Sequence, residues 1–455
     1  MSFLLIFTLQ CLFPIFDLEA NEFTGMSIVN TDTQTREFTV TATSPDGTNA
    51  QSVRLTLNAS AQRAGLLREI LGTTGPTSGW IRIDSALNTC TSYMTFGTEQ
   101  SLAATEAMQA APVGLVILPH ISVNTGFAEL NHIDTRIAAV NPSSTGANVT
   151  ARLIGLDGGL GGIFRFAIPA SGSRTVRVSE IFQSSLPNNN LGGKTFSGYV
   201  QLESNTPIAA WQRIETPLSR SLLRGRTLEE SQLTSSATIP HFAFGGGYDS
   251  VINLINMSST TLTLEVTAHD DKGQRLGDAV QVTLIPGVAL RASVPEFFRI
   301  PVITIFPPRL ITGFIRIREA QSQRFQILGN VEIINSNSGP LSATMMVPVS
   351  DSASDAWTMP FAMSSAGYFT GYAIVNPNEL LAVQTDVQVE VVNPDGTVRS
   401  RSSVQLAPSN RTAALVPAGV RGGYLRFSSN LPIHVGGSIG TEDLRQLDQL
   451  PGIRQ

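Results

Sequence analysis

Residues 239–256, IPHFAFGGGYDSVINLIN, bring together side chains that could bind a metal ion or a phosphate. His241 lies beside an apolar run, and the glycines Gly245–Gly247 precede Asp249. A phosphate-binding loop needs a Lys-Ser/Thr pair and a following helix. Neither is present, and the next residues, Ser250–Asn256, are expected to form a β-strand. The sequence therefore predicts that the glycines join two strands.

Two histidines occupy the same place in a repeated pattern, which argues against a metal site. His120 follows a proline as His241 does, but the other two copies of the pattern carry Ile15 and Phe361 there. A scaffold that accepts Ile or Phe at this place does not need a ligand there. We therefore expect both histidines to be structural.

Two further loops carry glycines or acids. The glycine loop at 157–162 is not followed by a helix, so it does not fit a nucleotide site. The loop His269-Asp270-Asp271 could offer carboxylates to calcium, but it lacks the spaced ligands and the distal Glu of a calcium loop. Neither Gly-x-Ser-x-Gly nor His-Glu-x-x-His occurs. We predict no catalytic, cofactor-binding or metal-binding residue, and no enzyme activity.

The composition favours β-structure and excludes a nucleic-acid partner. A chain of 455 residues is too long for one ordinary core, so several domains are expected. Charged residues are only 14% of the chain, against roughly 25% in average soluble domains. Much of the remaining polarity comes from Gly, Ser, Thr and Asn, which suit turns and strand surfaces. The net charge is −5 and no basic run occurs, so no nucleic-acid binding is expected.

The first sixteen residues, MSFLLIFTLQCLFPIF, are apolar and leave two interpretations open. They resemble the apolar part of an export signal, without its basic region and its small-residue cleavage site. Alternatively, they contain the first β-strand. No other apolar run reaches membrane length, so no membrane span is expected in the mature chain. Cys11 and Cys90 could be bridged only if this segment is retained, and we expect two buried thiols instead.

Four sequence marks recur in the same order four times, which indicates a tandem repeat. The first is a hydrophobic-Pro start, at Pro14, Pro119, Pro240 and Pro360. The second is a Val-Asn or Ile-Asn pair, at Asn30, Asn141, Asn256 and Asn376. The third is a turn that ends in glycine, at Gly47, Gly158, Gly273 and Gly396. The fourth is a glycine-aromatic pair, at Gly79-Trp80, Gly198-Tyr199, Gly313-Phe314 and Gly423-Tyr424.

The repeats predict an all-β fold. Apolar residues alternate with polar ones in segments such as Thr261–His269, as expected for strands with one buried face. About seven short strands in about 100 residues is typical of an immunoglobulin-like or fibronectin III-like sandwich. We therefore predict four tandem immunoglobulin-like/fibronectin III-like β-sandwich domains of about seven strands each. Single helical turns are compatible with Val178–Phe182 and Val294–Phe298.

The repeats also predict boundaries and roles for the marks. The aromatic residue of each glycine-aromatic pair is expected to fill the space between two sheets, with Arg82, Arg316 and Arg426 facing outward. The Asn256 side chain is expected to cap a strand end. The predicted domains are 13–100, 118–218, 239–336 and 359–440, with connectors near 98–117, 217–238 and 336–358. Residues 1–12 form the apolar segment, a partial export signal or first strand, and residues 441–455 form a polar tail that could pack as a short helix.

In these four marks the chain resembles uncharacterised secreted bacterial proteins made of tandem immunoglobulin-like/fibronectin III-like β-sandwich repeats. The resemblance covers about residues 13–440 and carries no functional residues with it. It implies an exported protein, located at the cell surface or in the extracellular matrix.

Two functions are expected. The first is a non-catalytic extracellular structural or adhesive protein, a surface or filament-forming component whose sheet edges pair with other subunits or with copies of itself. The alternative is a carbohydrate- or protein-binding module of a secreted system, with surface glycans as a ligand class. Only Trp80, Trp211 and Trp357 could stack on sugars, and Trp80 is assigned to a core. A string of sandwiches would have a radius of gyration near ~40 Å, against ~22 Å for a compact chain.

Overall fold

The computed structural model describes residues 9–18, 22–72, 75–87, 89–98, 101–109, 114–126, 132–190, 192–217, 219–231, 233–301, 309–321, 323–336, 343–379 and 384–455. The regular secondary structure of these residues is nearly all β-strand, arranged in several small antiparallel sheets. The first eight residues of the predicted N-terminal segment and parts of the predicted connectors lie outside this set. No described helix has the length and apolar character needed to cross a membrane.

The strands fall into four successive units, numbered 1 to 4. Unit 1 contains β1 (Leu9–Asp17), β2 (Phe23–Val29), β3 (Arg36–Thr43), β4 (Ala50–Leu57), β5 (Gln62–Leu66), β6 (Ser78–Ser85), β7 (Ser92–Gly97) and β8 (Leu102–Glu106). Unit 2 contains β9 (Leu115–Asn124), β10 (Asp134–Val140), β11 (Ala147–Gly155), β12 (Leu160–Ile168), β13 (Ser173–Arg177), β14 (Thr195–Ser204), β15 (Ala209–Glu215), β16 (Arg220–Arg224) and β17 (Arg226–Thr227).

Units 3 and 4 follow the same plan. Unit 3 contains β18 (Ser236–Phe244), β19 (Tyr248–Asn256), β20 (Leu262–His269), β21 (Arg275–Leu284), β22 (Ala289–Ser293), β23 (Ile311–Glu319), β24 (Ile327–Asn335) and β25 (Ala343–Pro348). Unit 4 contains β26 (Ser354–Met359), β27 (Met363–Ser364), β28 (Tyr368–Val375), β29 (Thr385–Val392), β30 (Val398–Leu406), β31 (Arg411–Leu415), β32 (Val420–Arg421), β33 (Tyr424–Thr441), β34 (Leu447–Pro451) and β35 (Ile453–Arg454). A single helical turn follows the fifth strand of units 1 to 3, as α1 (Leu67–Leu71), α2 (Val178–Ile181) and α3 (Val294–Phe297).

Each unit pairs two sheets with one strand order. In unit 1 the sheets are β1-β6-β3-β4 and β5-β2-β7-β8, and units 2 and 3 repeat this order. In unit 4 the long strand β33 serves both sheets, as the sixth and the seventh strand in turn. The order differs from that of constant-type immunoglobulin domains, in which the first and second strands share a sheet.

Each unit has an eighth strand that the sequence did not predict. These strands, β8, β16, β25 and β34, lie in the segments expected to be connectors or the C-terminal tail. The expected short helix within residues 441–455 is wrong, because that segment forms β34 and β35. After the eighth strand the chain pairs with the first strand of its own unit, through Met108, β17, Ser350 or β35.

The proline and glycine marks allow the first, sixth and third strands of a unit to lie close together. In units 1 to 3 the pairing of the first strand with the sixth shifts register at the proline, so the missing N–H breaks no ladder bond. The marked glycine of the sixth strand lies opposite this bulge. A Cβ at Gly79, Gly198, Gly313 or Gly423 would overlap a carbonyl oxygen of the third strand. Only glycine allows the two backbones to approach so closely.

The asparagine mark caps a loop in every unit, as predicted for Asn256. All four asparagines are fully buried. The Asn256 side-chain amide donates to the carbonyls of Thr260 and Leu284, and its oxygen accepts the N–H of Ser258. Asn30, Asn141 and Asn376 make equivalent bonds. The asparagine thus ties the loop after the second strand to the end of the fourth.

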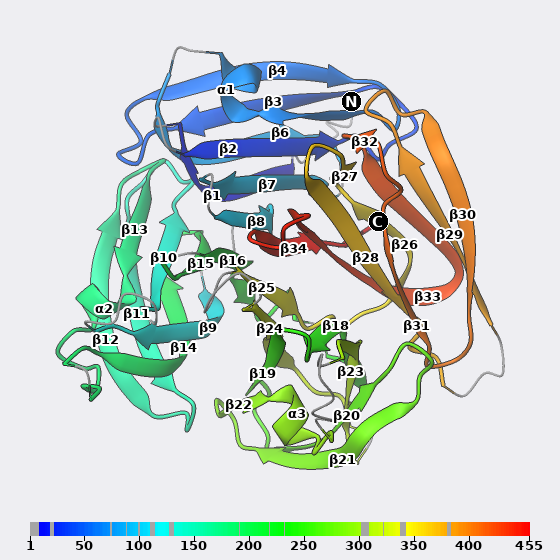
Figure 1. Cartoon of the computed structure of the whole chain (residues 1–455). Coiled ribbons are helices and arrows are strands. Elements are labelled where there is room, and N and C mark those ends of the chain that lie inside the picture. Colours follow the sequence, from blue (N-terminus) through cyan, green and yellow to red (C-terminus); the bar gives the residue numbers. More distant parts are fainter. Residues whose placement is uncertain are drawn as a thin grey trace, which may run out of the picture.

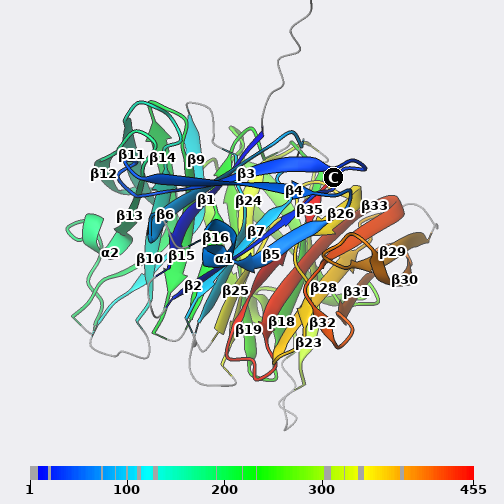
Figure 2. The same ribbon diagram turned by 90° about the horizontal axis from the view of Figure 1, so that it is seen from above.

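The four units close into a ring (Figure 1). The turn between the third and fourth strands of each unit accepts a backbone hydrogen bond from the next unit. These bonds are Ser173 N to Pro45 O (2.9 Å), Ala289 N to Leu156 O (2.9 Å), Arg411 N to Asp271 O (3.1 Å) and Gln62 N to Pro394 O (2.8 Å). The last bond joins unit 4 to unit 1. Figure 2 shows the first and last units side by side, so the chain is compact and not an extended string.

In units 1, 2 and 4 the aromatic residue of the glycine-aromatic pair belongs to this contact, which corrects the prediction that it fills its own sandwich. Trp80 packs with the core cluster of unit 2, and its indole N–H donates to Ser171 O at 2.9 Å. Tyr199 and Tyr424 donate in the same way to Gly287 O and Ser60 O of the next unit. Strand alternation places the aromatic ring on the same face as the outward arginine two residues later.

The eighth strands meet at the centre of the ring (Figure 1). β8 packs against β16 and β34, and β25 packs against the same two strands. The centre therefore contains one strand from every unit.

A disulfide joins Cys11 on β1 to Cys90, which corrects the expectation of two free thiols. Because β1 begins at Leu9, the end of the apolar N-terminal segment is part of the first strand. The bridge ties this strand to the segment that precedes β7, across a sequence separation of 79 residues.

We predict that Cys90→Ser lowers the free energy of unfolding by roughly 2–4 kcal/mol, because a long loop is no longer closed in the unfolded chain. Urea denaturation under oxidising conditions measures the change. The double variant Cys11→Ser/Cys90→Ser is the control and should match the single variant. A double variant that is much less stable than the single one would show that the effect comes from packing.

Candidate functional site

The two repeated histidines lie at contacts between units. His120 is 2% exposed and faces β22 and β24 of unit 3. Nη1 of Arg291 lies 3.1 Å from His120 Nδ1, and Glu332 Oε2 lies 3.6 Å from His120 Nε2. His241 contacts Arg411 of unit 4. Ring-to-ring contact replaces these pairs in unit 4, where Phe361 stacks on Tyr93 of unit 1.

Burial keeps both histidines neutral. It lowers the pKa of His120 to about 4, with a further decrease from Arg291 that Glu332 partly opposes. Burial and then Arg411 hold the pKa of His241 well below its usual value. A neutral imidazole beside an arginine is a hydrogen-bond acceptor. The described residues contain no group of three or more His, Cys, Asp or Glu arranged to hold a metal ion.

The glycine and acid loops serve the architecture. Gly245–Gly247 all have positive φ and form the turn between β18 and β19. Gly158 lies against Gly287 of unit 3, in the ring contact. In the acid loop, Asp271 pairs with Arg411, and Asp270 accepts the backbone N–H groups of Lys272 and Gln274. These carboxylates are therefore already used within the protein.

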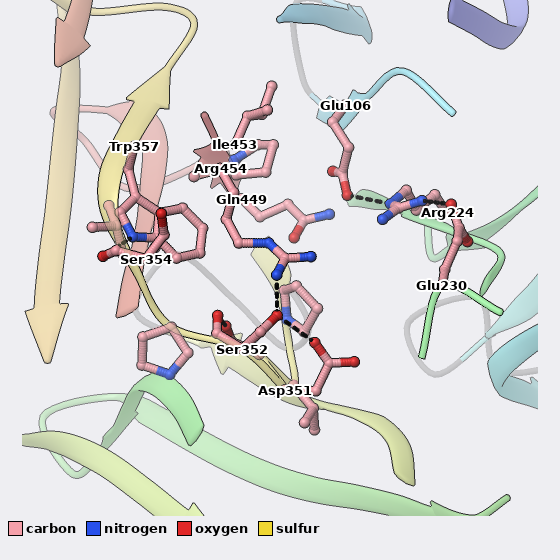
Figure 3. Close-up of a pocket in the computed structure, with 18 of the residues that line it drawn as sticks. Glu106, Arg224, Glu230, Asp351, Ser352, Ser354, Trp357, Gln449, Ile453 and Arg454 are labelled. Carbon is pink, nitrogen blue, oxygen red and sulfur yellow. Dashed lines mark hydrogen bonds and ion pairs between the residues drawn. The ribbon is translucent and has the colours of Figure 1, made fainter. Parts of the chain in front are cut away.

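A polar pocket of about 590 Å³ lies where the four units meet (Figure 3). Each unit lines it with its eighth strand and the segment that follows. The lining includes Glu106 from unit 1, Arg224 and Glu230 from unit 2, Asp351 from unit 3, and Gln449 and Arg454 from unit 4. No single unit could form this site.

Most of the charges in the pocket are paired. Arg224 Nε donates to Glu106 at 2.7 Å, and its Nη1 donates to Glu230 at 2.9 Å. Although burial lowers the pKa of Arg224, the two glutamates raise it more, so this charge is fixed. Arg226 lies 3.3 Å from Asp351. Arg454 instead donates to the hydroxyl of Ser352 and makes no ion pair with a described carboxylate.

Three buried polar atoms on the pocket wall have no hydrogen-bond partner within the described part of the chain: Glu106 Oε2, Arg226 Nε and Gln449 Oε1. Buried polar atoms are nearly always paired in folded proteins. Water or a bound molecule in the pocket is the natural partner of these atoms.

The tryptophans offer no open ring face for a sugar. Trp80 and Trp211 are fully buried, and Trp357, on the pocket wall, is only 4% exposed. Its indole N–H donates to the carbonyls of Ser354 and Ile433. Trp80 lies between units and not in its own core.

The sequence analysis missed every charged residue of the pocket, because all of them lie in the predicted connectors or tail. One signal was readable. The three connectors contain short apolar runs, such as Leu102–Ala104 and Met345–Val347. A fifth mark was also missed, a Ser or Thr six residues before each marked asparagine. These hydroxyls, Thr24, Thr135, Ser250 and Thr370, bond the backbone at the end of the first strand or, in unit 4, in β27.

No family model and no curated protein matches the chain. Among solved structures, protein 1070 of Thermotoga maritima is 14% identical, over 25% of this chain and 94% of that one, with a TM-score of 0.20. The Anabaena sensory rhodopsin transducer is 15% identical, over 23% of this chain and 91% of its own, with a TM-score of 0.19. The BSP domain of a biofilm-associated protein is 8% identical, over 95% and 91% of the two chains, with a TM-score of 0.16. Scores this low support no assignment of fold or function.

We predict that His120 makes the protein less stable in acid. Its pKa of about 4 lies below the ordinary value of 6.5, so the unfolded chain binds more protons between these values. The stabilisation is complete above pH 6.5 and decreases as the pH falls toward 4, by roughly 3 kcal/mol in total. Urea denaturation across this range measures the slope.

His120→Gln should flatten that slope, because glutamine does not titrate. His132→Gln is the matched control, since His132, just before β10, is only partly buried. Equal slopes for the wild type and His120→Gln would contradict the assignment.

Proposed function

We propose that the chain is a non-catalytic extracellular protein with a structural or adhesive role, built from four tandem β-sandwich domains related to the immunoglobulin-like and fibronectin III-like architecture. Its partners are copies of itself or other proteins, bound through sheet edges. The observation that carries the proposal is the set of unpaired edges on the outside of the ring.

The fourth strand of each unit, β4, β12, β21 or β30, ends its sheet and lies at the periphery (Figure 1). The eighth strands, by contrast, lie at the centre of the ring. The edge of each first strand is covered by the segment that follows the eighth strand of the same unit. The fourth strands thus present an open edge on the periphery of each unit. An open edge can pair with a strand from another chain.

Among these edges, β12 is the least protected against pairing. Charged side chains discourage edge-to-edge contact. β30 carries Arg399 and Arg401 and β21 carries Arg275 and Asp278, whereas β12 has only Arg165 and β4 only Arg54. Exposed apolar side chains distinguish β12 from β4. Leu160 and Ile163 on β12 are 57% and 42% exposed. We therefore assign self-association to the β12 edge.

The disulfide supports an extracellular location. Disulfides persist in oxidising compartments and are rare in the cytosol. The Cys11–Cys90 bridge lies at the base of unit 1, with Cys11 buried in the core cluster. A carbohydrate-binding role receives less support, because no tryptophan ring is open to stack on a sugar.

We predict that Ile163→Lys abolishes assembly without unfolding the ring. Position 163 is exposed in the single chain, but strand pairing at β12 would bury the charged lysine. Light scattering after size exclusion gives the mass, and electron microscopy shows whether filaments form. The wild-type protein should be oligomeric or filamentous, and the variant monomeric.

Ser400→Lys on β30 is the matched control, since it adds the same charge to an edge that already carries two arginines. This variant should assemble like the wild type. A wild-type chain that stays monomeric at its highest soluble concentration would refute the proposal.

A further inference from the structure

The central pocket is a second feature that the structural or adhesive role does not explain. Its charged and amide side chains come from four segments that are separated widely in sequence but lie around one space (Figure 3). We propose that this pocket binds a small organic acid that also carries hydrogen-bond donors, such as a hydroxy- or amino-carboxylate.

The unit 4 wall of the pocket supplies a cation for the acid group. Arg454 makes a hydrogen bond to Ser352 but no described ion pair, while Arg224 and Arg226 are both matched with carboxylates. The planar guanidinium fits a carboxylate through two parallel hydrogen bonds. The positive charge of Arg454 also acts on the nearby His434. Burial and then Arg454 lower the pKa of His434 to about 3.

Two hydrogen-bond acceptors on the pocket wall, Gln449 Oε1 and Glu106 Oε2, would bind hydrogen-bond donors on the ligand. Gln449 is 2% exposed, its amide nitrogen donates to Leu222 O at 3.1 Å, and its oxygen has no partner in the described chain. Glu106 uses Oε1 for Arg224, while its Oε2 is buried and unpaired. An acceptor left unpaired in a protein interior destabilises the folded state. Hydroxyl or ammonium groups on the ligand would satisfy both oxygens.

Other ligand classes fit less well. A neutral sugar would need an aromatic face, and Trp357 is almost covered. A metal ion would need several free carboxylates, but Glu106, Glu230 and Asp351 are paired with arginines, which leaves Glu229 alone among the described lining side-chain carboxylates. The volume of about 590 Å³ lies within the usual range for small-molecule sites, roughly 300–1,000 Å³.

The test compares ligands that differ only in the acid group. D-glucuronate is compared with D-glucose, and L-alanine with L-alaninamide, by isothermal titration calorimetry and by the shift in melting temperature of the full chain. At least one acid should bind and its neutral counterpart should not. The acid that binds shows whether the donors are hydroxyl or ammonium groups.

Arg454→Gln should weaken binding of that acid by about tenfold or more, because a charge-assisted hydrogen bond is lost. Arg399→Gln, an exposed arginine on β30, is the matched control and should bind as the wild type does. The ligand comparison uses the unaltered chain, so the proposal stays testable if Arg454→Gln does not fold. Binding of neither acid, equal binding of a neutral counterpart, or equal binding by Arg454→Gln would overturn the proposal, and none of these results bears on assembly through β12.

Discussion

The structure depends on a head-to-tail contact between units that repeats until it closes. Each unit offers a turn carbonyl on one side and the N–H of the first residue of its fifth strand on the other, and the fourth turn meets the first unit. Contacts of this kind form a ring only if the rotation at each contact divides a full turn evenly, and otherwise they form an open helix. The glycines in the turns let each unit approach the next at the required distance. A Cβ on Gly47, Gly158, Gly273 or Gly396 would press on the neighbouring unit.

The same constraint explains which residues tolerate change between copies. The position after the bulge proline holds His120, His241 or Phe361, and each is matched to what it meets across the contact. The backbone bonds are the constant part of the contact and the side chains are the variable part. Four contacts of one geometry can therefore contain an arginine-imidazole pair, an aromatic stack or, at Gln62, a buried amide network.

Much of the fold could be predicted from the sequence, because alternating apolar and polar residues indicate strands and glycines indicate turns. In unit 3 the strand predicted at Thr261–His269 is β20, which begins at Leu262, and the helical turns expected within Val178–Phe182 and Val294–Phe298 are α2 and α3. The aromatic residues were misplaced because an apolar residue on a strand was assumed to face its own core. Because side chains alternate along a strand, Trp80 lies on the same face as Arg82. The surface that buries Trp80 belongs to the neighbouring unit, and so it exists only in the closed ring of units.

The pocket could not be predicted, since it depends on relations between units and not on any local pattern. Glu106, Arg224, Asp351 and Arg454 come from four segments, and no spacing rule links them until the ring has closed. The eighth strands were missed because runs of about five residues do not establish a period.

The junction between units 4 and 1 differs from the other three in one respect, because its partners lie at opposite ends of the chain. Gln62 and Tyr424 meet across it, whereas the other junctions join consecutive units. A ribosome makes unit 1 first, and N-terminal domains generally fold first. The face of unit 1 that receives Pro360 and Tyr424 must therefore stay exposed until unit 4 has been synthesised, so Val29 and the polar groups around Gln62 meet solvent or a chaperone first.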